Sequence, residues 1–172
     1  HGQLRTPEVT VPFRVLSSVA DVTAGSADQI SRIVAEVGHV HDTVDQLEPR
    51  LSKAMRWVSE FVPAEDRTTV RTAADAVRLA ALSERETRWV DLLVDGLADE
   101  PDLDEVTALI YGVPKLALGM AIADAPTEEV KADQKAFFRL LYNLLVDADR
   151  GPRLPTLVMA LGTERVCSLL GR

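Results

Sequence analysis

The chain has 172 residues, of which 47% are hydrophobic and 27% are charged; this balance is typical of a folded protein and excludes intrinsic disorder. Lys and Arg number 19 against 27 Asp and Glu, so the formal net charge is −8, which argues against nonspecific binding to DNA or RNA because that binding depends on neutralising phosphates. No apolar run reaches the length of a membrane span and no signal-peptide pattern opens the sequence, so we expect an intracellular, cytoplasmic protein without a membrane contact.

The N-terminal part of the chain is predicted to hold two helices. Residues 1–10 carry no hydrophobic periodicity and are interpreted as a terminal remnant or linker. Helical spacing covers residues 12–23, with a proline at the start, where it is favoured. Residues 26–29 form a capping-box sequence, in which a serine and the residue three positions later satisfy free amides of the first turn. This box predicts a second helix, ended by Gly38.

Three helices are predicted in the middle of the chain. Residues 49–62 begin with a proline suited to a first helical turn, and apolar residues at helical spacing predict another helix over residues 67–81. A second capping box, at residues 83–86, opens the third helix. Trp57 and Trp89 fall within apolar stripes of these helices, so core packing is favoured for both over a role in stacking on bases.

The last third of the chain continues the helical pattern. A helix beginning at Asp102 is expected to end at the Gly-Val-Pro sequence of residues 112–114, and residues 115–123 are expected to form another short helix. Two further short helices are predicted near the C-terminus, of which Thr163 caps the second. Cys167, the single cysteine, lies among apolar residues and is expected to be a small buried hydrophobe.

The expected fold is all-α. No stretch alternates between apolar and polar residues with hairpin signals at its ends, so no strand is predicted. The short connections predict an irregular bundle or cage of about 8–10 helices without a sheet. Residues 11–172 would form this helical region, either as one bundle or as two, covering about residues 11–100 and 101–172.

A helix predicted over residues 128–146 has the features most suggestive of a function. Apolar residues fall on one of its faces and should enter the core. On a different face Lys131, Lys135 and Arg139 recur every four residues and therefore lie one above the other. We call these three residues the basic ridge, and Tyr142 continues their line.

Two arginines follow this helix in the sequence Arg-Gly-Pro-Arg, residues 150–153, which we call the RGPR turn. The planar guanidinium groups of Arg150 and Arg153 suit bidentate contact with phosphate or carboxylate. With the basic ridge they place five cations within 23 residues of an acidic chain, which indicates a local binding surface. The alternative is that the ridge is a solvated helix face and that either arginine caps a helix or pairs with Asp147 or Asp149.

Other candidate sites are weaker. Acidic residues recur between positions 91 and 105, and they are interpreted as a solvated face or a docking surface for a basic partner. His39 and His41 are two residues apart and point to different sides of a helix, so a metal site is not expected. No motif for a phosphate loop, a zinc site or a nucleophilic serine occurs in the sequence, so catalysis by this chain alone is not predicted.

Several short sequences occur in a fixed order and together resemble a known family. They are Pro12-Phe13-Arg14, Arg56-Trp57, Phe61-Val62-Pro63-Ala64-Glu65, Ile110-Tyr111, Phe137-Phe138, Leu141-Tyr142, Arg150-Gly151-Pro152-Arg153-Leu154, Ala160-Leu161-Gly162 and Glu164-Arg165-Val166. As an ordered set, they resemble the C-terminal region of class I lysyl-tRNA synthetases over nearly the whole chain. The ending is also similar to that of bacterial glutamyl-tRNA synthetases.

The resemblance implies an α-helical cage that binds the anticodon stem and loop of lysine tRNA. A separate N-terminal Rossmann domain of the same protein would activate lysine with ATP and Mg²⁺. The His-Ile-Gly-His and Lys-Met-Ser-Lys-Ser signatures of that domain are absent from this sequence, so an excised anticodon-binding region without a cofactor of its own is implied. The alternative, from another class, is a helical protein-interaction or regulatory module that uses the acidic residues 91–105.

The resemblance also implies which residues touch tRNA. It places Arg14 and the RGPR turn among family-typical positions and makes the basic ridge a surface that contacts the RNA backbone. Phosphate contacts would position the loop, and unstacked anticodon bases would be read by stacking and by hydrogen bonds to their edges. The candidate tRNA-binding residues are Arg14, Lys131, Lys135, Arg139, Tyr142, Arg150 and Arg153.

Overall fold

The computed structural model describes residues 13–23, 30, 33, 44–63 and 67–172. Its elements are α1 (Phe13–Thr23), η1 (Val44–Leu47), α3 (Arg50–Phe61), α4 (Ala76–Ala80), α5 (Glu84–Leu97), α6 (Leu103–Ala117), α7 (Glu128–Val146), α8 (Leu154–Leu161) and α9 (Thr163–Leu169). These described residues contain helices and no strand, so the all-α prediction is confirmed. The helix expected after the first capping box lies outside the described ranges, except for Ile30 and Ile33, which are buried. His39 and His41 also lie outside these ranges.

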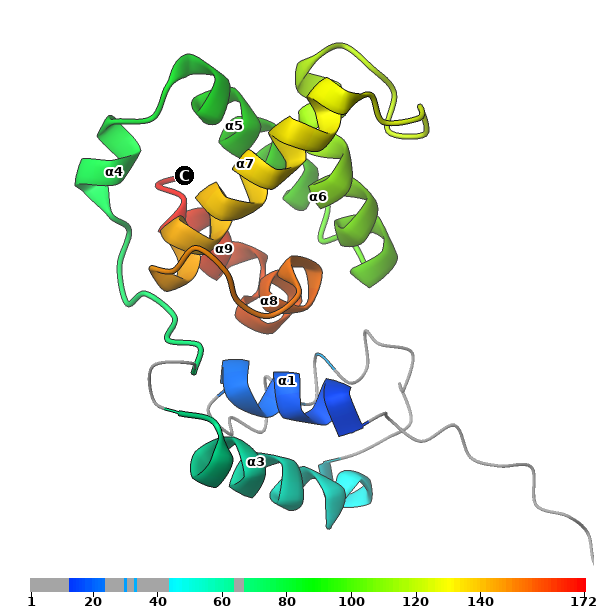
Figure 1. Ribbon diagram of the computed structural model, residues 1–172, viewed down its shortest axis with the longest axis vertical. Coiled ribbons are helices and arrows are strands. Elements are labelled where there is room, and N and C mark those ends of the chain that lie inside the picture. Colours follow the sequence, from blue (N-terminus) through cyan, green and yellow to red (C-terminus); the bar gives the residue numbers. More distant parts are fainter. Residues whose placement is uncertain (1–12, 24–29, 31–32, 34–43, 64–66) are drawn as a thin grey trace, which may run out of the picture.

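The helices form two groups that face each other (Figure 1). Helices α1 and α3 pack against each other, while α5, α6, α7, α8 and α9 pack together in the larger group. Helix α8 also contacts α1, which joins the two groups. None of the helices in the described part of the chain is both long and apolar enough to cross a membrane.

Capping boxes fix the starts of α5 and α6, as the sequence predicts. The Ser83 hydroxyl accepts the Glu86 amide at 3.3 Å, and the Glu86 carboxylate accepts the Ser83 amide at 2.9 Å. The Ser83 hydroxyl also donates to the Glu86 carboxylate at 2.7 Å. The bond from the Ser83 amide, and then the bond from its hydroxyl, lower the pKa of Glu86. Asp102 and Glu105 exchange the same pair of bonds at 2.8 and 2.9 Å. Both helix starts are therefore set by local sequence.

Helix α7 runs through the larger group and matches its predicted range. The Thr127 hydroxyl caps it by accepting the Val130 amide at 3.2 Å, and the chain leaves it at Asp147, which has a left-handed φ of 55°. The five apolar residues predicted to enter the core are all buried: Val130, Phe137, Leu141, Leu144 and Leu145. The charged residues Glu128, Lys131, Lys135 and Arg139 of this helix are exposed, whereas Asp133 is buried and accepts a hydrogen bond from Arg85 at 2.9 Å.

Two of the predicted helices, over residues 67–81 and residues 115–123, differ from the structure. Residues 67–81 are helical only over Ala76–Ala80, because the preceding segment bonds to distant residues instead of to itself. The Thr68 amide and hydroxyl donate to Asp21 at 3.1 and 2.6 Å, and the Arg71 amide donates to the Leu145 carbonyl at 2.8 Å. We call residues 67–75 the strap, since they bind to α1 and to the end of α7.

The second error concerns Pro114, which does not end its helix. Helix α6 continues to Ala117, and no separate helix covers residues 115–123. Gly112, Val113 and Pro114 are all buried, so their packing offsets the hydrogen bond that proline cannot donate. The chain turns at Gly119, whose φ is 75°.

The start of α9 also differs from its prediction. Gly162, rather than the predicted Thr163, occupies the N-cap position of this helix.

The two tryptophans have different environments. Trp89 is 1% exposed and packs against Phe137, which confirms its predicted core position. Trp57 is 44% exposed, so the core prediction for this residue is wrong. Helix α3 buries Leu51, Ala54 and Val58, and Trp57 lies beside that buried stripe. Cys167 is half-buried, and burial raises the pKa of its thiol.

Candidate functional site

The basic ridge does not form a row of unpaired cations. Lys131 pairs with Glu128 at 2.7 Å, and Arg139 donates to both carboxylate oxygens of Asp149, Nε to Oδ1 at 2.8 Å and Nη2 to Oδ2 at 2.9 Å. Lys135 is exposed and has no ion pair among the described residues. The alternative raised by the sequence, in which Asp147 or Asp149 pairs with Arg150 or Arg153, is not what the described residues show, because Asp149 pairs with Arg139 and Asp147 pairs with Arg71.

The Arg139–Asp149 contact links the middle of α7 to the residue before the RGPR turn. The Asn143 side-chain amide adds a bond to Asp149 at 3.0 Å and another to the Arg139 carbonyl at 2.8 Å. Hydrogen bonds from Arg139, and then from Asn143, lower the pKa of Asp149, and the same contact raises the pKa of Arg139. The carboxylate is thus held in its charged form at neutral pH.

Replacement of Arg139 by Gln is expected to raise the pKa of Asp149 towards the ordinary value of about 3.9. A carboxyl group with a lowered pKa contributes to stability above its unfolded value, and this contribution disappears as the pH falls through the folded value. An NMR titration of the side-chain carboxyl carbon measures this pKa. It should cover about pH 2 to 6, a range that includes the ordinary pKa of an aspartate. An Asp149 pKa that is identical in both proteins would contradict the pairing of Arg139 with Asp149.

Tyr142 holds the RGPR turn rather than extending the ridge. Its hydroxyl donates to the Pro152 carbonyl at 2.6 Å. The ring lies against Gly151, where an added Cβ would be 3.1 Å from the Tyr142 Cε1 atom, so a side chain at this position would press on the ring. Burial, with a smaller contribution from Tyr111, raises the pKa of Tyr142. The phenol therefore remains a neutral hydrogen-bond donor that fixes the turn.

Arg150 and Arg153 are exposed on this fixed turn. Within the described part of the chain, neither guanidinium has an ion pair or a side-chain hydrogen bond. The turn is anchored on one side through Asp149 and on the other through the Pro152 carbonyl. The two arginines are consequently presented to solvent by a segment whose backbone is tied to α7.

The strap ties the same end of α7 to the rest of the molecule. The Arg71 side chain donates to the Asn143 carbonyl at 3.1 Å, bonds to the Asp147 carboxylate and lies 3.3 Å from Asp75. Arg165 of α9 then donates to the Arg71 and Thr72 carbonyls at 2.9 and 2.7 Å. A cation at the last carbonyls of a helix is favourable because of the helix dipole. Nothing in the sequence pattern indicated this role for Arg71.

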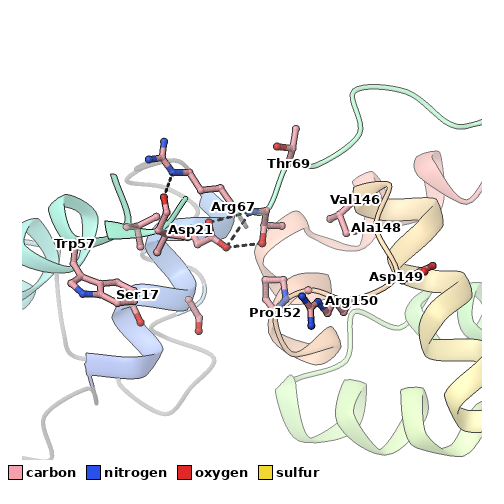
Figure 2. Close-up of a pocket in the computed structure, with 15 residues that line it drawn as sticks. Ser17, Asp21, Trp57, Arg67, Thr69, Val146, Ala148, Asp149, Arg150 and Pro152 are labelled. Atoms are coloured by element: carbon pink, nitrogen blue, oxygen red, sulfur yellow. Dashed lines mark hydrogen bonds between the residues drawn. The ribbon is translucent and has the colours of Figure 1, made fainter. Parts of the chain in front are cut away.

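An open cleft of about 600 Å³ lies between the two helical groups (Figure 2). Trp57, Ser17 and Asp21 lie on its α1 and α3 side, and Arg150 and Pro152 lie across from them. The strap closes a third side. The cleft therefore combines an exposed indole on one side with an arginine of the RGPR turn on the other.

The structure brings some candidate residues together and separates others. Arg139, Tyr142 and Arg150 meet around the RGPR turn, whereas Lys131 and Lys135 do not line the cleft. Arg14 belongs to α1, and its side chain lies outside the described parts. No group of three or more His, Cys, Asp or Glu among the described residues could hold a metal ion. Sequence reasoning favoured a core position for Trp57, because its place in an apolar stripe concealed its exposure.

The acidic residues 91–105 are only partly available as a docking surface. Arg172 donates to the Asp91 carboxylate at 2.9 Å, and Asp102 and Glu105 are engaged in the capping box of α6. The remaining acidic residues flank helix ends and are exposed. This arrangement is typical of a solvated helix face.

Comparison of the sequence with those of known proteins shows which class of protein it resembles. No protein-family model matches the chain. Its relatives are tRNA ligases, and the chain spans about 30% of the length of the curated proteins that it matches. In particular, it is 47% identical to a lysine–tRNA ligase of Streptomyces coelicolor over 99% of this chain and 30% of that protein.

More distant relatives carry the same name. A lysine–tRNA ligase of Methanopyrus kandleri is 33% identical over 93% of this chain and 29% of that protein. A lysine–tRNA ligase of Thermococcus kodakarensis is 26% identical over 92% of this chain and 28% of that protein. Nearly the whole chain is thus homologous to a segment of lysine–tRNA ligases, which are aminoacyl-tRNA synthetases. The predicted resemblance to class I lysyl-tRNA synthetases is confirmed.

Proposed function

We propose that this chain is the anticodon-binding region of a lysine–tRNA ligase. In this proposal, it binds the anticodon stem and loop of lysine tRNA in the cytoplasm, while an N-terminal catalytic domain of the same protein attaches lysine with ATP and Mg²⁺. The similarity of 99% of the chain to lysine–tRNA ligases supports a role within such an enzyme. The all-α fold agrees with the helical cage that the resemblance implies.

The observation that carries the proposal is the pair of exposed arginines on the RGPR turn, neither of which has an ion pair within the described residues. Guanidinium groups form bidentate contacts with phosphate, and phosphate contacts set the position of an RNA without reading its sequence. Because Asp149 and Tyr142 anchor the turn, Arg150 and Arg153 are held ready for such contacts. We propose that they bind the RNA backbone and that Arg139 supports them from α7.

The division of residues 11–172 into two sub-bundles also remains a proposal. Helices α5 and α6 pack closely together across the boundary expected near residue 100. Helices α1 and α3 pack together on the other side of the strap. We therefore propose that the strap, rather than residue 100, separates the two units, with the cleft between them.

Replacement of Arg150 or Arg153 by Ala is expected to weaken binding of a lysine-tRNA transcript and to reduce its salt dependence. Each lost phosphate contact lowers the slope of log affinity against log salt by roughly 0.7–0.9. Titrations monitored by fluorescence anisotropy at several salt concentrations measure both effects. Circular dichroism should show unchanged helicity, because both side chains are exposed.

The matched control is Arg88→Ala, which removes an exposed cation of α5 that does not line the cleft. It changes the net charge by the same amount and should leave the affinity and its salt slope near those of the original protein. Equal losses in all three variants would indicate a general charge effect. Binding of lysine tRNA with unchanged strength by Arg150→Ala and Arg153→Ala would remove the RGPR turn from the interface.

A further inference from the structure

An apolar surface lies on α6 and on the loop that follows it. Tyr111, Leu118 and Ile122 are 45%, 41% and 39% exposed. Tyr111 and Leu118 are seven residues apart and therefore lie on one helical face, and Ile122 packs over Gly112 of the same helix. The half-buried Phe138 of α7 meets Tyr111 edge to face, with ring centroids 5.0 Å apart. We call Tyr111, Leu118, Ile122 and Phe138 the apolar patch.

The loop that carries Ile122 is held in one shape by its own hydrogen bonds. Lys115 Nζ donates to the carbonyls of Ile122 and Asp124, at 2.6 Å in each case. The Ala121 amide donates to the Asp124 carboxylate at 2.7 Å, and the Met120 amide donates to the Lys115 carbonyl at 2.9 Å. Because this backbone is already ordered, little conformational entropy is lost when a partner covers the loop.

The composition of the apolar patch does not suit RNA. Residues 111–124 contain two charged side chains, Lys115 and Asp124, and both are bonded within the loop. RNA binding depends on cations that neutralise phosphates. The loop precedes α7 and the RGPR turn follows it (Figure 1), and a helix of 19 residues is about 28 Å long. The apolar patch therefore serves a contact other than the proposed RNA surface.

The length of the relatives indicates what this contact is. In the lysine–tRNA ligase of Streptomyces coelicolor, about 70% of the protein lies outside the segment that matches this chain. A surface on the same polypeptide is present at a high effective concentration, in the millimolar range for short flexible linkers. It therefore has an advantage over a separate protein in covering an exposed apolar surface, which is the kind of surface that marks an interaction site.

We propose that the apolar patch packs against the part of the ligase polypeptide that lies outside this chain, through an apolar surface on that part. This inference rests on the proposed function, which makes the chain one region of a longer ligase. The contact is additional to the covalent connection and fixes the orientation of the helical region. The anchored loop supplies a preformed shape for it, and Tyr111 and Phe138 supply the aromatic area.

Hydrogen exchange measured by mass spectrometry tests the inference on two proteins, the complete ligase that contains this chain and this chain alone. Amides of residues 118–124 are expected to exchange roughly 10-fold more slowly in the complete ligase, because burial of the loop suppresses its local opening. Residues 76–80 of α4 provide the internal control. They include Val77, which is 82% exposed and lies outside the apolar patch, and their exchange should be equal in the two proteins.

Leu118→Asp in the complete ligase is the matching variant. It places a charge in the proposed contact and should return the exchange of residues 118–124 to the rate of the isolated chain. Because Leu118 is exposed, circular dichroism of the isolated chain should be unchanged. Val77→Asp is the matched control, since it introduces the same charge at another exposed apolar residue and should leave the protection of the loop intact.

The remaining outcomes would overturn the inference. Equal exchange of residues 118–124 in the two proteins would mean that nothing in the ligase covers the apolar patch. Protection that appears in the isolated chain as its concentration rises would assign the patch to a second copy. Protection that survives Leu118→Asp would place its source elsewhere. None of these results depends on tRNA, so a failure of lysine-tRNA binding would contradict the proposed function and would be recognised separately.

Discussion

Phe137→Ala is expected to lower the free energy of unfolding by about 3–5 kcal/mol, the usual cost of removing a large aromatic side chain from a core. Phe137 is fully buried. Its ring centroid lies 5.7 Å from that of Trp89 and 6.5 Å from that of Phe138, so α7 meets α5 through this residue. The truncation would leave a cavity where these helices pack. Urea denaturation followed by circular dichroism measures the loss.

The control for this prediction is Phe61→Ala, since Phe61 is 68% exposed. Surface substitutions usually change stability by less than about 0.5 kcal/mol. The slope of the unfolding free energy against urea should be similar in the two variants, because it reflects the surface exposed on unfolding. A loss below about 1 kcal/mol for Phe137→Ala would mean that α5 and α7 do not pack through this ring.

Arg71→Ala is expected to lower the free energy of unfolding by about 2–4 kcal/mol, because hydrogen bonds to charged groups contribute about 1.5–3 kcal/mol each. The Arg71 side chain is only 20% exposed. It bonds to the Asn143 carbonyl and the Asp147 carboxylate, so its removal leaves the end of α7 without its cation. Chemical denaturation measures the stability of the variant.

Hydrogen exchange provides the local measurement for the strap. The Arg71 amide donates to the Leu145 carbonyl, and its exchange should accelerate in Arg71→Ala because this variant loosens the strap. Arg71→Lys is the matched control, since it keeps the charge but loses the planar guanidinium group. Its stability should lie between that of the unmodified chain and that of Arg71→Ala. If Arg71→Ala keeps the stability and the slow exchange of the unmodified chain, the strap is held without this side chain.

The helices that could be predicted from the sequence are those with local start signals. Ser83 and Asp102 each bond to an acidic residue three positions later, so the information lies within one turn of the chain. The range of α7 was predictable for a similar reason, because Thr127 caps it and its apolar residues follow a helical period.

The strap could not be predicted, because its bonding partners are remote. Residues 67–75 have helical spacing, yet Thr68 bonds to Asp21 and Arg71 bonds to residues of α7. A segment whose backbone and side chains are satisfied by distant residues does not need its own helical bonds. Periodicity describes the pattern of apolar residues and contains no signal for such contacts. Val77, one of the apolar residues at helical spacing, is 82% exposed.

The sequence indicated which residues make up the candidate site but not which of them form ion pairs with one another. The sequence identified the RGPR turn and the basic ridge as neighbours, and the structure places Arg139 beside that turn. Which cation would pair with Asp149 depends on the path of the chain after α7. The exposure of Trp57 depends on how α3 is rotated against its neighbours, and a tryptophan in an apolar stripe can be either buried or exposed.

The anchoring of the RGPR turn has a consequence for the entropy of complex formation. A phosphate that approached Arg139 would have to displace Asp149 and would release one attachment of the turn. A phosphate that approached Arg150 would meet a guanidinium that has no competing carboxylate in the described part of the chain, on a backbone that is already restrained. In the proposed complex, less conformational freedom would then be lost when the RNA docks. Arg139 is committed to the scaffold, so the two arginines of the turn would bind the RNA at a lower ordering cost.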